Sequence, residues 1–599
     1  VKLAYWEALN KEGTAFEYLY PLNTEKFSAR NLQELTINIS LQTGAPLRTV
    51  YSPTHPVNIV RRGERQAVAN YQVKNIKPDQ DFKLYFDTDT SKIGVSLLTY
   101  RPANQESPSD LKGTDGYFLL NISPGFSINP QESEPKSLTF ILDTSGSMAG
   151  AKLEQAKRAL RYCIHNLNPA DRFEIVRFST ESEGLFEQLT GVTPGRIREA
   201  DDFIADLSAT GGTNLESALR QALIGGKSSG GPHLIVLITD GKPTLGETDI
   251  ESLLKIIGAE NKSEARIFTF GIGTDINTHL LDRITELTRA YRTYISPQED
   301  LEVTISNFYQ KIQSPVLTDL HLDFAGKVKT LQMYPQALPD LFWGASIVSF
   351  GRYRGTGEAK VILTGRLGNK PYRLEREVNF PAEDPGHDFI AALWATRRVG
   401  YLLDQIRLHG ENPELVAEVT ELARNYGIIT PYTSYLILED ETGRISRDDL
   451  DPSLQTLGNL PAVEERKDKS QTAYRSMKEN SGAGSIKASQ ELQDLNQAAN
   501  TAAFQSLTYQ GDGAQDQGGS NTDSAIKYIR GRAFYYIPAD RFWVDSKLST
   551  LKSPKIIRIK FASESYFQLL NKEPEIAALF ALGRQIRFEW KGQIYEVFA

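Results

Sequence analysis

The chain has 599 residues, of which 40% are hydrophobic and 24% charged, and its 67 basic and 75 acidic residues leave a net charge of −8. This length is about four times the ~150 residues of a typical domain, so several hydrophobic cores are expected and a single small module is excluded. The composition favours folded structure over disorder, and the negative charge offers no broad basic field to a phosphate backbone, so no nucleic-acid partner is expected.

The N-terminal region of the chain has the pattern of β structure. It opens at Val1 without an initiator methionine or an apolar leader, which predicts that the natural start, with any export signal, lies outside this sequence. The runs LTINISL (35–41) and FKLYF (82–86) alternate apolar and polar residues with the period of two that is typical of antiparallel strands. A second β-rich block follows much later, from Val316 to Pro381.

Between the two β blocks, strand-like runs alternate with amphipathic helices, as in a parallel sheet that is covered on both faces. Strands are predicted at 138–143, 173–178, 234–239 and 266–272. One helix places its apolar residues on a single face: Leu153, Ala156, Leu160, Cys163, Ile164 and Leu167. Another helix begins near Thr248, with Glu251 completing a capping box. The segment is therefore predicted to be a doubly wound α/β domain.

The same segment holds the single cysteine, Cys163, which excludes an internal disulfide and a thiolate cluster, and which we expect in the core. Apolar runs such as 234–238 are much shorter than the roughly 18 residues that a membrane-spanning helix needs, so no membrane span is expected in the visible chain. The seven histidines are dispersed without HxxxH spacing, which argues against a zinc site.

After Pro385 the pattern becomes helical, and Gly427 is the expected C-cap of a helix through Leu415 to Leu422. The run ITPYTSYLIL (429–438) has the pattern of a closing strand. A polar composition follows, typical of a linker, with one short helix expected near residues 486–499. The last 75 or so residues regain aromatic and β-branched content, which predicts a small α/β domain.

Oxygen-bearing side chains follow the predicted strands of the central segment. The motif DTSGS places Asp143, Ser145 and Ser147 after the first strand, Thr213 ends a glycine-bearing loop before a helix, and Asp240 ends the strand 234–239. Loops at the carboxyl ends of parallel strands converge in a crevice, so these five residues can share one site. Two carboxylates and three hydroxyls suit a hard divalent cation such as Mg²⁺.

The balance of these ligands bears on function. If hydroxyls dominate and the aspartates act largely through water, the cation keeps much of its charge, and an open coordination position would accept an Asp or Glu carboxylate from a partner. The alternative for DTSGS is a helix N-cap with a buried aspartate, which Ser and Asp also provide.

The five residues resemble the metal-ion-dependent adhesion site (MIDAS) of the von Willebrand factor type A domain, which has the pattern DxSxS with a distant Thr and a distant Asp. The resemblance implies Mg²⁺ (or Ca²⁺ or Mn²⁺). It implies Ser145, Ser147 and Thr213 as direct ligands, and Asp143 and Asp240 as ligands directly or through water.

The sequences on either side of the A domain resemble a more specific group of proteins. SPTHPV (52–57), DGYFLLNISP (115–124), LPDLFWG (338–344) and YGIITPYTSYLILED (426–440) are similar to segments around the A domain in inter-alpha-trypsin inhibitor heavy chains and their bacterial relatives. The opening residues resemble the end of a VIT domain. The tail FYYIPADRFWVD (534–545) is more similar to bacterial members, and the DPHF sequence by which vertebrate heavy chains attach to glycosaminoglycan is missing.

The expected fold is a multidomain α/β plus β protein in which an A domain is inserted in a β-sandwich, as in integrin β chains. Its expected segments are the end of a VIT domain (1–28), the N-terminal portion of the β-sandwich (29–133), the A domain (134–314), the C-terminal portion of the β-sandwich (315–384), a helical segment with a closing strand (385–461), a polar linker with a short helix (462–524) and a small α/β C-terminal domain (525–599).

The resemblance implies a non-enzymatic adhesion or scaffolding protein that is secreted, periplasmic or on the cell surface. Its A domain would engage an acidic residue of a protein partner, such as a surface or matrix protein. A second interpretation is a structural or assembly protein whose metal serves intramolecular or subunit contacts. A hydrolase is disfavoured because GSMAG (146–150) is not a GxSxG elbow, and GIGTDI (271–276) lacks the spacing of a dinucleotide-binding loop.

Overall fold

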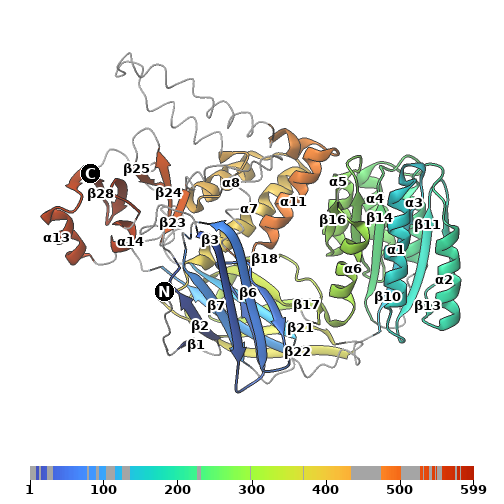
Figure 1. Ribbon diagram of the computed structural model, residues 1–599, viewed down its shortest axis with the longest axis horizontal. Helices are drawn as coiled ribbons and strands as arrows, with labels where there is room; N and C mark the ends of the chain where they lie inside the picture. Colours follow the sequence, from blue (N-terminus) through green and yellow to red (C-terminus); the bar gives the residue numbers. More distant parts are fainter. Residues whose placement is uncertain are drawn as a thin grey trace, which may run out of the picture.

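The structure is a computed structural model, drawn in Figure 1. It describes residues 9–12, 15–22, 32–76, 78, 80–88, 93–102, 115–124, 135–225, 231–296, 299–343, 345–367, 370–428, 430–433, 472, 474–500, 526–529, 532–537, 542–546, 548, 556–573, 576–580 and 582–599. An α/β unit lies at one end of the molecule and a C-terminal unit at the other, with β-sheets and helices between them (Figure 1).

Residues 10–88 form two sheets that share one core. Their strands are β1 (Asn10–Glu12), β2 (Ala15–Tyr20), β3 (Leu32–Gln42), β4 (Leu47–Tyr51), β5 (Asn58–Arg61), β6 (Gln66–Ile76) and β7 (Phe82–Thr88). The orders are β1-β2-β7-β4 and β3-β6-β5, and apolar residues such as Leu41, Leu47 and Phe82 are buried between the sheets. Because β2 pairs with β7, strand pairing crosses the boundary expected at residue 28, and β1 and β2 belong to this unit.

The strands on either side of the α/β unit combine in two further sheets. They are β8 (Ile93–Tyr100), β9 (Gly116–Pro124), β17 (Pro315–Gly326), β18 (Lys329–Tyr334), β19 (Leu341–Phe342), β20 (Ile347–Arg354), β21 (Gly357–Leu367) and β22 (Lys370–Phe380). The orders are β18-β20-β9-β8 and β19-β17-β21-β22. Phe118, Leu120, Val361 and Phe380 lie in one buried cluster that both sheets share.

The first β block is therefore divided, which differs from the expected single half-sandwich at 29–133. Of its described strands, only β8 and β9 join the second block, and β9 pairs with β20 in antiparallel register from Ile122 with Ile347 to Gly116 with Tyr353. Alternation of apolar and polar residues identifies a strand but does not select its partner, so the sequence could not show this division.

The α/β unit contains β10 (Ser137–Asp143), α1 (Ala151–His165), β11 (Arg172–Phe178), β12 (Ser182–Gly184), β13 (Thr190–Gly191), α2 (Pro194–Asp206), α3 (Leu215–Gly225), β14 (His233–Thr239), α4 (Ile250–Glu260), β15 (Arg266–Ile272), α5 (Thr278–Thr288), β16 (Arg292–Ile295) and α6 (Leu301–Ile312). Its sheet order is β12-β11-β10-β14-β15-β16, and the strands from β11 to β16 in this order are parallel. The four predicted strands are confirmed as β10, β11, β14 and β15.

Both faces of this sheet are covered. Helices α1, α2 and α6 bury one face and α3, α4 and α5 the other, so every residue of β10, β14 and β15 is buried. Cys163 lies in the first of these cores, as predicted, and burial raises the pKa of its thiol. The expected start of α4 is corrected by one residue, because the Asp249 carboxylate, and not Thr248, caps the helix by accepting the Ser252 N–H at 2.9 Å.

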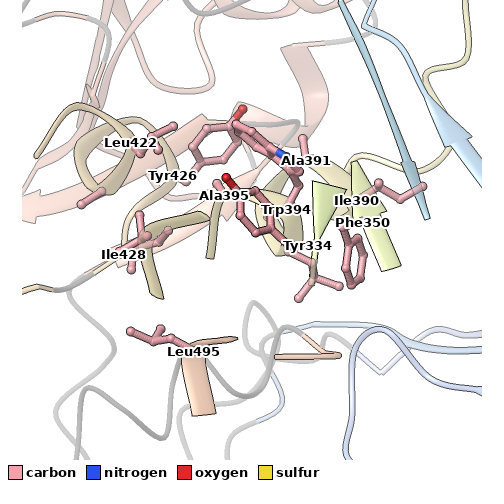
Figure 2. Packing of buried hydrophobic residues seen from close by; sticks show 14 of the residues in the cluster. Tyr334, Phe350, Ile390, Ala391, Trp394, Ala395, Leu422, Tyr426, Ile428 and Leu495 are labelled. Atoms are coloured by element: carbon pink, nitrogen blue, oxygen red, sulfur yellow. The ribbon is translucent and has the colours of Figure 1, made fainter. Parts of the chain in front are cut away.

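Helix α7 (Phe389–His409) packs on β8, β9, β18 and β20, and helices α8 (Pro413–Tyr426) and α11 (Ala483–Gln497) pack against α7. Figure 2 shows side chains from α7, α8, β18, β20 and α11 in one buried cluster around Trp394, whose indole N–H donates to the Gln332 carbonyl at 2.9 Å. Helix α8 ends at Gly427 in the left-handed conformation, as predicted. Of the expected strand 429–438, the described residues 430–433 contain a turn at 431–432 and are not assigned to a strand, and the rest lies outside the described residues.

Helix α11 corrects the expected linker at 462–524. Its side chains Ala488, Leu492 and Leu495 are buried in the cluster around α7, so the short helix expected there belongs to the folded body. Gly400 in α7 lets the two helices approach closely, because a Cβ at this position would lie 2.7 Å from the Leu495 Cβ and 2.9 Å from the Asn496 backbone nitrogen.

We expect Gly400→Ala to destabilise the protein by about 1–3 kcal/mol, because the added methyl group forces the α11 backbone away from α7. The opposite sign holds for an unhindered helix, where alanine is better than glycine by about 1 kcal/mol. Gly258 in α4 is the matched control, since a Cβ there meets no atom within 4 Å, so Gly258→Ala should stabilise. Urea unfolding of both variants checks the prediction, and equal gains would contradict the close helix contact.

The C-terminal unit is a mixed sheet with two helices. It contains β23 (Ile526–Ile529), β24 (Arg532–Ile537), β25 (Phe542–Asp545), β26 (Ile556–Lys560), α13 (Glu564–Lys572), α14 (Ala577–Phe580), β27 (Ile586–Trp590) and β28 (Gln593–Phe598), in the sheet order β23-β24-β25-β27-β28-β26. Trp543, Phe580 and Phe588 lie in its core. Within the described residues of the whole chain, no helix has the length and apolar character to cross a membrane.

Candidate metal centre

The DTSGS motif forms the loop between β10 and α1. Asp143 is the last residue of β10 and is fully buried, and one of its carboxylate oxygens accepts the backbone N–H of Ser145 at 2.8 Å. A 3₁₀ turn at Gly146–Met148 then leads to α1. Ser145 precedes this turn, but its side chain makes no capping hydrogen bond in the described structure, which argues against the interpretation of the motif as a helix cap.

Hydrogen bonds connect four of the five predicted residues in series. The hydroxyls of Ser145 and Ser147 lie 3.1 Å apart, and the Ser147 hydroxyl donates to Asp240 Oδ1 at 2.7 Å. Asp240 follows β14, which is paired with β10, so the two carboxylates emerge side by side at the same edge of the sheet. Asp143, Ser145 and Asp240 are buried, whereas Ser147 is exposed at the mouth of the site.

Thr213 reaches the same place from a third loop. Gly211, at φ 82°, accepts the Gly146 N–H on its carbonyl at 3.1 Å, and the Thr213 N–H donates to the Thr244 hydroxyl at 2.9 Å. A Cβ built on Gly241 would lie 3.2 Å from Thr213 Oγ1, and 3.8 Å from both Asp143 Oδ2 and Ser147 Oγ. These three oxygens therefore lie close to one point beside Gly241. Because Ser145 and Asp240 both contact the Ser147 hydroxyl, the structure brings all five predicted residues together.

The charge of this cluster favours a cation. Burial raises the pKa of Asp143 above its usual value; hydrogen bonds from Thr239 and Ser145 oppose this shift, and the nearby Asp240 carboxylate adds to it. Two buried carboxylates with three hydroxyl oxygens form the hard donor set that Mg²⁺, Ca²⁺ or Mn²⁺ accepts, so the residues fit such an ion. Across the described residues, no group of three or more His, Cys, Asp and Glu is placed to hold a metal, so the hydroxyls are needed to complete this site.

Two residues of the cluster were missed by sequence reasoning. The Thr239 hydroxyl donates to Asp143 Oδ2 at 2.6 Å, and the Lys152 ammonium donates to Asp240 Oδ2 at 2.5 Å and to the Ser147 carbonyl at 3.3 Å. A signal for Thr239 was its place directly before Asp240. Lys152 lies in the first turn of α1, directly after the loop, but nothing in the spacing indicates which carboxylate it meets.

Comparison with known proteins finds matches to the α/β unit and to a longer part of the chain. Residues 136–291 match the model of the von Willebrand factor type A domain family. The chain is 25% identical over 378 residues to inter-alpha-trypsin inhibitor heavy chain H2 of Sus scrofa, a match that covers 59% of this chain and 40% of the relative. It is also 25% identical over 373 residues to heavy chain H4 of Homo sapiens, with the same coverage. The chain thus spans about two fifths of the length of these curated relatives.

Matches among solved structures include a von Willebrand factor type A protein from Catenulispora acidiphila, with a TM-score of 0.41 at 17% identity, covering 56% of this chain and 87% of that one. The ArnB paralog VWA2 from Sulfolobus acidocaldarius gives a TM-score of 0.39 at 20% identity, covering 57% and 92%. Residues 136–291 therefore match the von Willebrand factor type A domain, within a chain that is similar to inter-alpha-trypsin inhibitor heavy chains over part of its length.

Proposed function

We propose that this protein binds a divalent cation, Mg²⁺ in the first place, through Asp143, Ser145, Ser147, Thr213 and Asp240, and that it uses this site to engage an acidic side chain of a protein partner. The observation that carries the proposal is the convergence of three loops on the point beside Gly241. A von Willebrand type A domain in a chain related to heavy chains indicates a protein-interaction role, which supports the same conclusion.

Each residue of the site has a role in this proposal. The bound cation would supply an open coordination position for a carboxylate. The neutral hydroxyls of Ser145, Ser147 and Thr213 donate oxygen without cancelling charge, and the hydrogen bond from Thr239 holds Asp143 in place. Ser147 and Leu245 are exposed on this face, and Leu245 packs near Gly212, so a partner can reach the ion from solvent.

We expect Asp143→Ala to lower Mg²⁺ affinity by at least 10-fold, because it removes one of two carboxylates from the donor set. Thr213→Val should act in the same direction through loss of a hydroxyl, and Asp275→Ala, a change at an exposed carboxylate that pairs with Lys242, should leave Mg²⁺ affinity unchanged. Titration calorimetry with Mg²⁺ measures the affinities, and circular dichroism checks that each variant folds. Unchanged Mg²⁺ binding by Asp143→Ala would overturn the site.

The second candidate is a structural or assembly role, in which the metal serves contacts within the protein or between subunits. Burial of Asp143 and Asp240 is the observation in its favour. Chelation separates the two roles. If EDTA abolishes capture of a partner while the melting temperature barely changes, adhesion is supported; if melting falls and no partner binds, the structural role is supported. A hydrolase would instead show turnover that is lost in Ser147→Ala.

We also propose that the A domain is inserted in a β-sandwich and that the protein acts outside the cytoplasm, in the periplasm, at the cell surface or as a secreted protein. The pairing of β9 with β20 supports the insertion, because it joins strands from before and after the α/β unit. Arg266 at the start of β15 supports it too, with bonds to Asp340 at 3.1 Å and to Asp319 at 2.7 Å in the β region. Expression of the natural gene with a reporter for export tests the location.

A further inference from the structure

Lys152 occupies the rim of the site in a way that the pattern of five ligands does not explain. Both carboxylate oxygens of Asp240 have partners, because Oδ1 accepts from the Ser147 hydroxyl at 2.7 Å and Oδ2 accepts from the Lys152 ammonium at 2.5 Å. The Asp240 side chain is fully buried, whereas that of Lys152 is 40% exposed. The lysine therefore reaches in from the rim to neutralise a carboxylate at the base of the site.

The charges around the site show what this contact does. Asp143 and Asp240 together carry two negative charges when ionised, and Lys152 offsets one of them. Without Lys152, a divalent ion would be attracted by the full negative charge of both carboxylates. It would also not be repelled by an ammonium group that bonds to Asp240, one of the proposed ligands. Lys152 belongs to the same chain as the proposed ligands, so its ammonium group competes with the ion for Asp240 at every concentration of free ion.

We propose that Lys152 is a built-in counter-ion of Asp240 that holds the divalent-ion affinity of this site down. The inference rests on the proposed function, since it concerns the same site. It predicts that loss of the ammonium group tightens ion binding for two reasons. The metal-free state loses the partner of a buried carboxylate, and the loaded state loses a repulsion.

The test compares Lys152→Met with the unmodified full chain by calorimetric titration with Mg²⁺ and, in parallel, Mn²⁺. We expect Lys152→Met to bind either ion on the order of 10-fold more tightly, with a lower melting temperature in EDTA and a larger rise on adding the ion. Lys152→Arg retains the charge and should bind within about 2-fold of the unmodified chain, since a guanidinium can replace the ammonium at a carboxylate.

Lys242 provides the matched control. It lies two residues after Asp240 and is 43% exposed, but it pairs with Asp275 at 2.9 Å rather than with a predicted ligand. Lys242→Met should therefore leave the affinity within about 2-fold, because the Lys242 ammonium pairs with Asp275 and bonds to none of the five predicted ligands. Equal tightening by Lys242→Met would show a general charge effect and overturn the role of Lys152.

The remaining outcomes separate this inference from the proposed function. If the unmodified chain binds Mg²⁺ or Mn²⁺ and Lys152→Met binds equally or more weakly, the inference fails and the metal site stands. If the unmodified chain shows no measurable binding and Lys152→Met binds, the lysine is confirmed as the group that suppresses the ion. If neither folded protein binds either ion, both proposals are overturned.

Discussion

Replacing Asp282 by alanine is expected to lower the free energy of unfolding by roughly 3–5 kcal/mol, because it removes the carboxylate that pairs with the buried Arg407 guanidinium. Asp282 in α5 is fully buried. Its Oδ2 bonds to the Arg407 guanidinium of α7 and accepts from the Ser489 hydroxyl of α11 at 2.7 Å. Its Oδ1 lies 3.0 Å from the Arg292 Nε and accepts the Tyr294 hydroxyl. One carboxylate thus joins the α/β unit to two helices outside it.

Urea unfolding of the full chain measures the loss, and amide exchange of residues 483–497 shows where it acts. We expect faster exchange in α11, because Ser489 and the neighbouring Ser485 depend on the same network. Glu286, one turn further along α5, is the matched control. It lies 3.6 Å from the His409 imidazole, both side chains are more than 40% exposed, and Glu286→Ala should cost less than about 0.5 kcal/mol. Equal losses from both variants would contradict the buried network.

The second large effect is expected at Asp171, which forms an ion pair with Lys136 at 2.5 Å. Neither side chain has any exposed surface. The Asp171 carboxylate also accepts the backbone N–H groups of Lys136 at 3.1 Å and Asn168 at 2.9 Å, where the chain enters β10. Asp171→Ala removes every one of these acceptors and leaves a buried ammonium group, so we expect a loss of about 3–5 kcal/mol.

Asp171→Asn removes the negative charge but keeps a hydrogen-bond acceptor. The pH dependence of its stability therefore shows the contribution of the charge. Burial lowers the pKa of Lys136, and the Asp171 carboxylate opposes that shift, so the asparagine variant should lower this pKa further. Since the unfolded chain then binds the proton more tightly than the folded one, the stability of the variant should rise with pH between the folded and unfolded pKa values of Lys136.

Urea unfolding at neutral and at alkaline pH tests this sign for Asp171→Asn. Glu154→Gln is the control, because Glu154 is 60% exposed beside Lys157 and should cost less than about 0.5 kcal/mol at either pH. A loss in Asp171→Asn that stays constant with pH would show that the hydrogen bonds, and not the charge, stabilise this corner of the fold.

The α/β unit was predictable from the sequence because its strands are covered on both faces. Such strands are nearly continuous apolar runs, as in 234–238 and in 138–142, which Thr139 interrupts, and the polar residue that follows each run marks the edge of the sheet. Sequence order and topology together were enough to bring Asp143 and Asp240 to one place. The contact of Lys152 with Asp240 was not predictable, because it depends on the direction of a long side chain across the loop.

A short helix was predicted where α11 lies, but it was placed in a polar linker, and its packing on the folded body was missed for a physical reason. Its buried face includes Ser485 and Ser489, which are hydroxyl partners of the Arg407 and Asp282 network rather than apolar residues. Apolar residues therefore recur at helical spacing in only some turns of α11, and the sequence on either side of the helix is polar. The pairing of β9 with β20 was likewise hidden, since more than 200 residues separate two strands whose alternation fits several partners.

The cluster around Trp394 has a consequence for the order in which the protein folds during synthesis. Its members extend from Tyr51 to Leu495, so strands made early wait for α7 and then for α11 before their apolar faces are covered. The core between the sheet and helices α3 to α5, in contrast, has all its buried apolar residues between Ile141 and Tyr294, so they are available once that segment has left the ribosome. The α/β unit is therefore expected to begin folding on the growing chain while the body that holds it is still exposed to chaperones.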